Sequence, residues 1–149
     1  MEIRPGEPVA AAALQKVFIA KGMRDEHLAL QRRLIARDPE LVAALELGLA
    51  ENGYEGAMHA TADLQAARYE GSSGPARGFI IPTFIARWYL LAGDHDRAME
   101  WLEKAFEVGD PNLPRTGFPA IWDPMRSDPR FQDLLRRMNL PMTPAAGTP

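Results

Sequence analysis

The sequence predicts an all-α fold, a right-handed α-solenoid of about three helix pairs that ends in a C-terminal capping helix. Two observations support this prediction. Glycines that can form turns recur at Gly22, Gly53 and Gly93, at separations of 31 and 40 residues, and a repeat of about 20–50 residues is typical of solenoids. On both sides of each glycine, apolar residues follow three- and four-residue steps, which is the period of an amphipathic helix.

The stretch from Trp88 to Pro111, WYLLAGDHDRAMEWLEKAFEVGDP, shows one helix pair most clearly. Gly93 follows an apolar run and can end that helix, because glycine adopts the left-handed backbone conformation at little cost. Asp94 or Asp96 can then cap the next helix by accepting hydrogen bonds from its free backbone N–H groups. The turn between the two helices is therefore expected to be tight.

The helix after this hinge has two distinct faces. Its apolar face is formed by Ala98, Met99, Leu102, Ala105 and Phe106. The opposite face is charged, with Glu100 and Lys104 one turn apart, where they can form an ion pair. Gly109 begins a Gly-Asp-Pro sequence that ends the helix. The pattern leaves open which face holds Trp101.

These signals place six helices in the sequence, at about 8–21, 24–37, 39–52, 54–69, 82–92 and 95–108. Pro82 suits the first turn of the fifth helix, where the missing N–H of proline costs nothing. That helix is apolar on nearly every side, as expected for a helix at the centre of the core. We expect Ile85 and Trp88 to be buried there against Ala98 and its apolar neighbours.

The segment after the sixth helix changes character. Residues 110–124 contain four prolines and cannot be helical throughout. A loop should fold back on the last helix pair and bury Phe118, Ile121 and Trp122. Asp123 and Asp128 each precede a proline and can cap a short helix. The apolar stripe of this capping helix would be Phe131, Leu134, Leu135 and Met138, with Arg130, Arg136 and Arg137 toward solvent.

We expect a single domain over residues 1–149. Its repeats would span about 8–38, 39–70 and 79–110, followed by a loop and capping helix at 111–141 and a tail at 142–149. A turn-rich insert from Glu70 to Pro75 accounts for the longer spacing between the second and third glycines.

The helix pair around Gly93 and the stretch WDPMRSDPRFQDLLRRMNLP, from Trp122 to Pro141, resemble tetratricopeptide-repeat (TPR) proteins. The second stretch is similar to the carboxyl-terminal repeat region of bacterial members of this family, and the resemblance covers about residues 8–141. In the first unit, His27 stands where the family has a small alanine. The resemblance implies that the first helix of each pair lines a concave face, which binds an extended peptide or a partner helix.

The concave face that the resemblance implies would take residues from the first helix of each unit. These residues are Lys16, Ile19, Glu46, Leu47, Ala50, Thr83, Arg87 and Leu90. Their mixture of apolar and charged side chains suits a protein ligand better than a small substrate, although ordinary core or solvent positions hold the same residue types. Arg87 is the only charge on its helix, so it either reaches the groove or pairs with a carboxylate such as Glu46.

Candidate catalytic and metal-ligating residues do not form a complete set. His59 and Asp63 lie one helical turn apart, and His95 precedes Asp96, but a metal site needs three or more convergent ligands. We therefore expect exposed or capping roles for both pairs.

Other polar groups have structural explanations. His27 follows two acidic residues and is interpreted as part of the charged opening of a helix. The two serines of the insert lack the following lysine of a phosphate-binding loop. Arg115 and Arg126 flank Trp122 and could bind an anion, but packing of the loop explains them more simply.

Composition excludes several classes of function. The chain has no cysteine, which rules out disulfides, thiolate catalysis and zinc–thiolate sites. A net charge of −3 and an isoelectric point near 5.6 give no field that would attract nucleic acid or a membrane surface. The sequence shows neither a signal peptide nor an apolar run that could span a membrane. We expect a bacterial cytoplasmic protein without catalytic residues, metal or cofactor.

Three hypotheses of function follow. The first is a non-catalytic scaffold that binds a peptide or partner protein and that can also form a homo-oligomer. The second is the C-terminal TPR part of a larger bacterial transcriptional or signalling regulator, joined to a winged-helix, cyclase or kinase domain. The third, a hydrolase or small-ligand-binding protein with a site after Asp110, is the weakest, because no acid, base and nucleophile converge.

Overall fold

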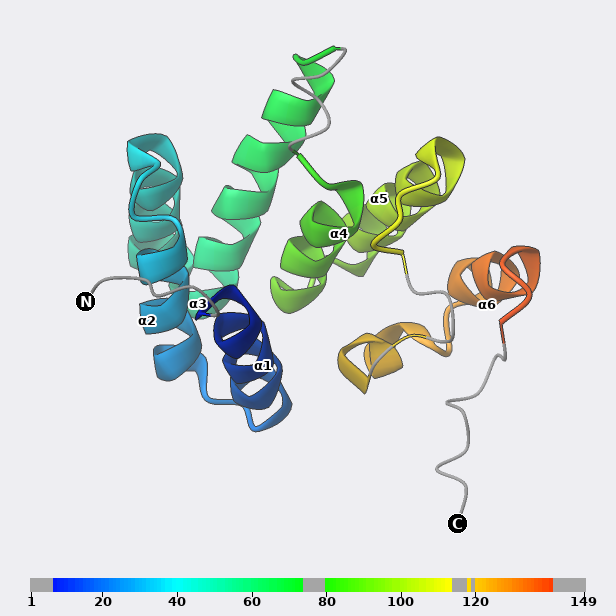
Figure 1. Ribbon diagram of the computed structural model, residues 1–149, viewed down its shortest axis with the longest axis horizontal. Helices are drawn as coiled ribbons and strands as arrows, with labels where there is room; N and C mark the ends of the chain where they lie inside the picture. Colours follow the sequence, from blue (N-terminus) through cyan, green and yellow to red (C-terminus); the bar gives the residue numbers. More distant parts are fainter. Residues whose placement is uncertain (1–6, 74–79, 114–117, 119, 141–149) are drawn as a thin grey trace. The chain divides into compact units, whose positions relative to one another are not determined.

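The structure is a computed structural model that describes residues 7–73, 80–113, 118 and 120–140 (Figure 1). Its helices are α1 (Glu7–Ala20), α2 (Arg24–Leu34), α3 (Pro39–Glu70), α4 (Pro82–Leu91), α5 (His95–Val108), the 3-10 helix η2 (Ala120–Met125) and α6 (Pro129–Arg137). No strand occurs within these described ranges, so the predicted all-α class is confirmed. The chain divides into two compact units, Met1–Val42 and Ala43–Pro149, which are considered one at a time.

The first unit contains the hairpin of α1 and α2. The chain turns at Gly22, whose φ is 67°, and the N–H of Met23 donates to the carbonyl oxygen of Phe18 at 2.8 Å. The second helix ends at Leu34, three residues before the expected end. After a short turn, Oδ1 of Asp38 accepts from the N–H of Leu41 at 3.2 Å and caps the start of the next helix.

His27 lies with the acidic residues in the first turn of α2, as interpreted from the sequence, but it is not part of their exposed charged surface. Its side chain lies in α2 but is buried, and so is that of Gln31, one turn further along the helix. The amide nitrogen of Gln31 lies 3.1 Å from Nε2 of His27, so the buried ring has a polar partner on its own helix.

The helix α3 begins at the end of the first unit and continues in the second, and it is two helices joined at a sharp kink. Asn52 and Gly53 leave the helical conformation, and the backbone of Gly53 has φ 64° and ψ −152°. This kink lies where the sequence places the hinge between helices 39–52 and 54–69. The two halves approach so closely at Gly48 and Gly56 that a Cβ atom on either glycine would overlap the carbonyl oxygen of the other.

The α4–α5 hairpin forms the centre of the core (Figure 1). Gly93 at the hinge has φ 78°, and Oδ1 of Asp94 accepts from the N–H of Arg97 at 3.1 Å, so the predicted hinge and cap are confirmed. Ile85 is buried as expected, but Trp88 is only half-buried. The buried apolar residues that α5 contributes are Ala98, Met99, Trp101, Leu102 and Ala105.

Two details of α5 resolve or correct the expectations from sequence. Trp101 is buried and packs edge-on against Tyr69 of α3, with the ring centroids 5.3 Å apart. The expected Glu100–Lys104 pair does not form. Lys104 instead pairs with Glu70, which brings it over the Trp101 ring, and Glu100 lies 3.7 Å from Arg97.

In the C-terminal segment, Phe118 and Trp122 are buried as predicted, whereas Ile121 is only half-buried against the same core cluster. The expected helix cap at Asp123 is wrong, because Pro124 lies inside the 3-10 helix η2 rather than at the start of an α-helix. Oδ1 of Asp123 accepts from Nε of Arg126, and that guanidinium also donates to the carbonyl oxygen of Phe118, both at 2.7 Å. Arg126 therefore holds the loop, whereas Arg115 lies outside the described residues.

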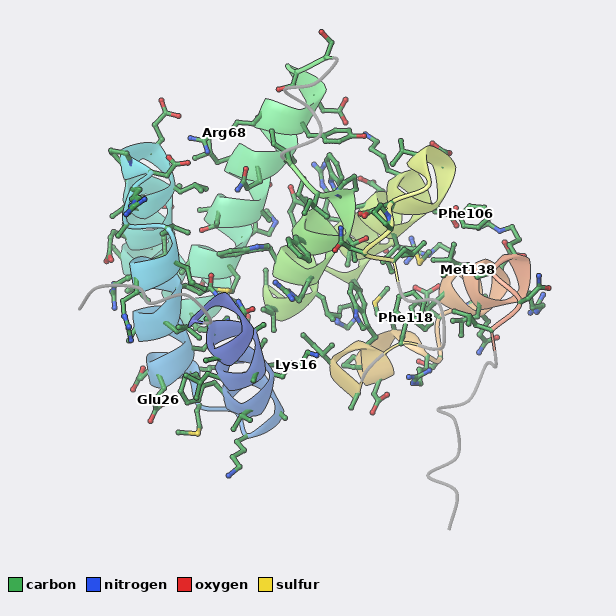
Figure 2. The ribbon with its side chains drawn as sticks, viewed as in Figure 1. Lys16, Glu26, Arg68, Phe106, Phe118 and Met138 are labelled. Carbon is green, nitrogen blue, oxygen red and sulfur yellow. The ribbon has the colours of Figure 1, made fainter. Side chains whose placement is uncertain are left out.

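The final helix, α6, has the predicted cap and stripe. Oδ1 of Asp128 accepts from the N–H of Arg130 at 2.8 Å. The stripe consists of buried Phe131, Leu134 and Leu135 and half-buried Met138, which Figure 2 labels. The tail at 142–149 lies outside the described residues.

Ion pairs connect α3, α5 and α6 at one repeated sequence separation. Lys104 pairs with Glu70, Arg130 with Asp96 and Arg137 with Glu103, and in each pair the partners are 34 residues apart. The capping residues of α5 and α6, Asp94 and Asp128, are also 34 residues apart. Arg137 further lies over the ring of Phe106, with its guanidinium carbon 5.1 Å from the ring centroid (Figure 2).

Candidate interaction surface

The helix α4 has one buried and one outward face. Six of its ten residues are buried, namely Pro82, Thr83, Ile85, Ala86, Tyr89 and Leu90. The remaining face carries Phe84, Arg87, Trp88 and Leu91, which follow the three- and four-residue steps of one helical stripe. Phe84 is 40% exposed and the other three are half-buried. We call these four residues the α4 stripe.

Arg87 is the only charged residue of the α4 stripe. Its guanidinium carbon lies 4.8 Å from the centroid of the Phe84 ring, in a cation–π arrangement. Burial lowers the pKa of Arg87 below its ordinary value. The structure gives its guanidinium no ion pair and no hydrogen bond to any residue in the described part of the chain, so the alternative in which Arg87 pairs with Glu46 is not observed.

Two residues predicted for the partner-binding face, Thr83 and Leu90, lie inside the fold instead. Leu90 belongs to the core cluster. The backbone N–H and the hydroxyl of Thr83 donate to Oδ2 of Asp110, at 3.0 and 2.6 Å. Both residues are therefore corrected from surface to interior positions, because α4 directs that side toward the core.

The carboxylate of Asp110 caps α4 from a distant point in the chain. Ile81, at the capping position of α4, has no side chain that could accept a hydrogen bond. Partial burial raises the pKa of Asp110, but hydrogen bonds from Thr83 and Asn112 outweigh this effect, so that pKa lies below its ordinary value.

The other predicted residues occupy two helices. On α3, Glu46, Leu47 and Ala50 are exposed and lie at helical spacing on one face, with Leu47 60% exposed. On α1, in the first unit, Lys16 is exposed and Ile19 is half-buried (Figure 2). Each helix thus presents part of the predicted set at its own surface.

A polar cluster links α3 to the α4–α5 hinge. Nδ1 of His59 lies 3.1 Å from Oδ2 of Asp63, and Nε2 of the same ring lies 3.0 Å from Oδ2 of Asp94. The hydroxyl of Tyr89 donates to Oδ1 of Asp63 at 2.7 Å. The sequence indicates the His59–Asp63 pair through its one-turn spacing, but no local signal indicates Asp94 or Tyr89, which are 35 and 26 residues from their partners.

The side chains of this cluster hold α3 against the α4–α5 hairpin. Both ring nitrogens of His59 contact carboxylate oxygens, one of Asp63 and one of Asp94. The ring and the two carboxylates therefore point at one another and do not converge on a shared ligand. Burial, followed by the hydrogen bond to Asp63, raises the pKa of Tyr89, which keeps its hydroxyl a donor. Within the described residues no group of three or more His, Cys, Asp or Glu side chains is arranged to hold a metal ion.

None of the helices in the described ranges is long and apolar enough to cross a membrane. Comparison of the chain with protein-family models, with curated proteins and with solved structures gives no match.

Proposed function

We propose that this protein is a non-catalytic interaction scaffold of TPR-like helix pairs, which binds a peptide or partner protein on the outward faces of its helices. The observation that carries the proposal is the α4 stripe. Its helix is packed into the core of the second unit on one side, yet the other side carries the exposed ring of Phe84 and the half-buried Arg87. Aromatic residues and arginine are enriched at protein–protein interfaces.

The repeated 34-residue separation supports the solenoid part of this proposal. The three ion pairs and the two helix caps that recur at this separation match the period of a TPR unit, about 34 residues. Each helix pair also turns at a glycine with positive φ, namely Gly22, Gly53 and Gly93. Stacked helix pairs of this kind bring one helix from each repeat into an extended binding surface.

A protein ligand fits these surfaces better than a small molecule. Small-molecule sites are concave and enclose most of their ligand. The α4 stripe and the exposed face around Leu47 instead combine apolar side chains with single charges, as interface surfaces do.

The test is selection of a random 12-residue peptide display library on the immobilised wild-type chain, followed by titration of the selected peptides. Phe84→Ser should weaken their binding at least tenfold, because it removes the exposed aromatic ring of the α4 stripe. Val108→Ser is the matched control, since Val108 is also an exposed apolar residue but lies on α5 (55% exposed).

Circular dichroism should show the same helicity for both variants, which separates binding from folding. Failure to select any peptide above the background of an unrelated helical protein would contradict the scaffold function. Equal losses for the two variants would place binding elsewhere than on the α4 stripe.

A further inference from the structure

Arg87, the cation of the α4 stripe, has no carboxylate partner among the described residues. Arg87 has five N–H donors and lies against the ring of Phe84, which attracts its charge but offers no oxygen acceptor. By contrast, Arg130 pairs with Asp96 and Arg137 pairs with Glu103. The stripe is thus complementary to a negative charge that the described chain does not supply.

The surroundings of Arg87 restrict the kind of anion. Phe84, Trp88 and Leu91 are apolar, and they extend on both sides of Arg87 along α4. Nucleic acid requires several cations to neutralise neighbouring phosphates, whereas this stripe has one. A carboxylate within an apolar segment would satisfy the guanidinium and cover the apolar side chains together.

We propose that the α4 stripe binds an acidic segment of a partner protein, in which an Asp or Glu side chain is flanked within two residues by apolar side chains. This inference rests on the proposed scaffold function and names the partner that this surface selects. The carboxylate accepts hydrogen bonds from Arg87, and the flanking side chains pack on Phe84 and Leu91.

The experiment compares two display libraries on the immobilised wild-type chain, one with all residue types and one without Asp and Glu. The full library should yield binders with an acidic residue between apolar ones, and the acid-free library should yield none. Arg87→Met should weaken the selected peptides by about 10- to 100-fold, as expected for loss of a charged hydrogen bond, and Arg87→Lys should weaken them less.

Arg136→Met provides the matched control, because Arg136 is an exposed arginine of α6 outside the α4 stripe. It should leave the affinities unchanged. Acid-free peptides of equal affinity, or acidic peptides that bind wild type and Arg87→Met equally, would overturn the inference while the scaffold function stands. Absence of binders from both libraries would remove the scaffold function and this inference with it.

A second copy of the chain is the competing occupant. Sedimentation of wild type and Phe84→Ser distinguishes it: we expect both to have the same oligomeric state. A wild-type dimer that Phe84→Ser dissociates would assign the stripe to self-association and overturn the inference.

Discussion

At the scale of single residues, Asp110 shows how one carboxylate joins two helices. It follows the end of α5 and caps the start of α4 through two hydrogen bonds from Thr83. Its Oδ1 also accepts from the backbone N–H of Asn112 at 2.9 Å, which fixes the chain after Gly109. The two ends of the α4–α5 hairpin are therefore tied by a side chain as well as by the core.

We predict that Asp110→Ala lowers the free energy of unfolding by about 0.5–2 kcal/mol, the cost of losing a helix cap. The loss should depend on pH. Because the pKa of Asp110 in the folded protein lies below its ordinary value of 3.8, its stabilisation is present above that value and is lost as the pH falls through the lowered one.

Urea unfolding of wild type and Asp110→Ala from pH 7 to pH 3 measures this contribution. The two midpoints should differ at pH 7 and converge as the pH falls below about 4. Asp133→Ala serves as the control, because Asp133 is an exposed carboxylate that contacts Arg137 on the surface of α6. A constant difference across the whole pH range would contradict the role of the Asp110 carboxylate.

Residue-scale features could be predicted where their signal is local. Gly93, Asp94 and Asp128 form a hinge and two caps, and each acts on residues within one turn of itself. The contacts of Thr83 with Asp110 and of His59 with Asp94 cross 27 and 35 residues, so no pattern within a helix could reveal them. These groups come together only when the chain folds.

The assignment of faces on α4 failed for a related physical reason. Nearly all of its residues are apolar, so the pattern lacks the contrast that separates an inner from an outer side. Leu90 is buried while Trp88 is half-exposed, although the bulkier tryptophan has more apolar surface to bury. Packing against α5 decides this, and the sequence of α4 alone does not contain that information.

At the scale of helices, the glycines with positive φ are not equivalent. Gly109, after α5, has φ 67° and ψ 41°, which is the left-handed helical conformation that asparagine also tolerates. Gly53, inside α3, has φ 64° and ψ −152°, a region that is essentially restricted to glycine. The two positions therefore differ in what can replace them.

We predict that Gly53→Asn lowers the free energy of unfolding by about 1–3 kcal/mol, because asparagine must adopt the strained backbone of the kink. Gly109→Asn should cost less than about 1 kcal/mol, since asparagine occurs naturally at left-handed helix ends. Urea midpoints of the two variants check the difference. Similar costs at both positions would contradict the special conformation of Gly53.

The helix positions themselves were largely accessible from sequence. Glycine hinges and Asp-Pro pairs mark local ends, and the starts of α2, α4 and α5 match the expected residues. The errors in helix assignment occur where the same short sequence is compatible with two local structures. An Asp-Pro pair begins α6 at Asp128, but at Asp123 the same pair lies within a 3-10 turn that Arg126 holds from the side.

At the scale of the whole molecule, stability depends on close packing of α5 into the core of the second unit. Ala98 is fully buried and Ser73 is exposed in the turn after α3. We predict that Ala98→Leu lowers the free energy of unfolding by about 1–3 kcal/mol, because three additional carbon atoms do not fit a filled core. Ser73→Leu should change it by less than about 0.5 kcal/mol.

Urea unfolding of these two variants compares a core position with a surface position. A midpoint for Ala98→Leu equal to that of wild type would show that the site beside Ala98 has unfilled space. Circular dichroism of both variants should retain the helical spectrum, which confirms that the comparison concerns one folded state.

The recurring 34-residue separation also bears on how the chain folds. The side-chain hydrogen bonds that join helices in the second unit span 26 to 35 residues, so each can form once the chain has grown by that length beyond the first partner. The entropic cost of closing loops of this length is modest, because it grows only slowly with the number of residues in the loop. Within the second unit, the contacts that join α3 to α4 and α5 can therefore form before α6 has left the ribosome.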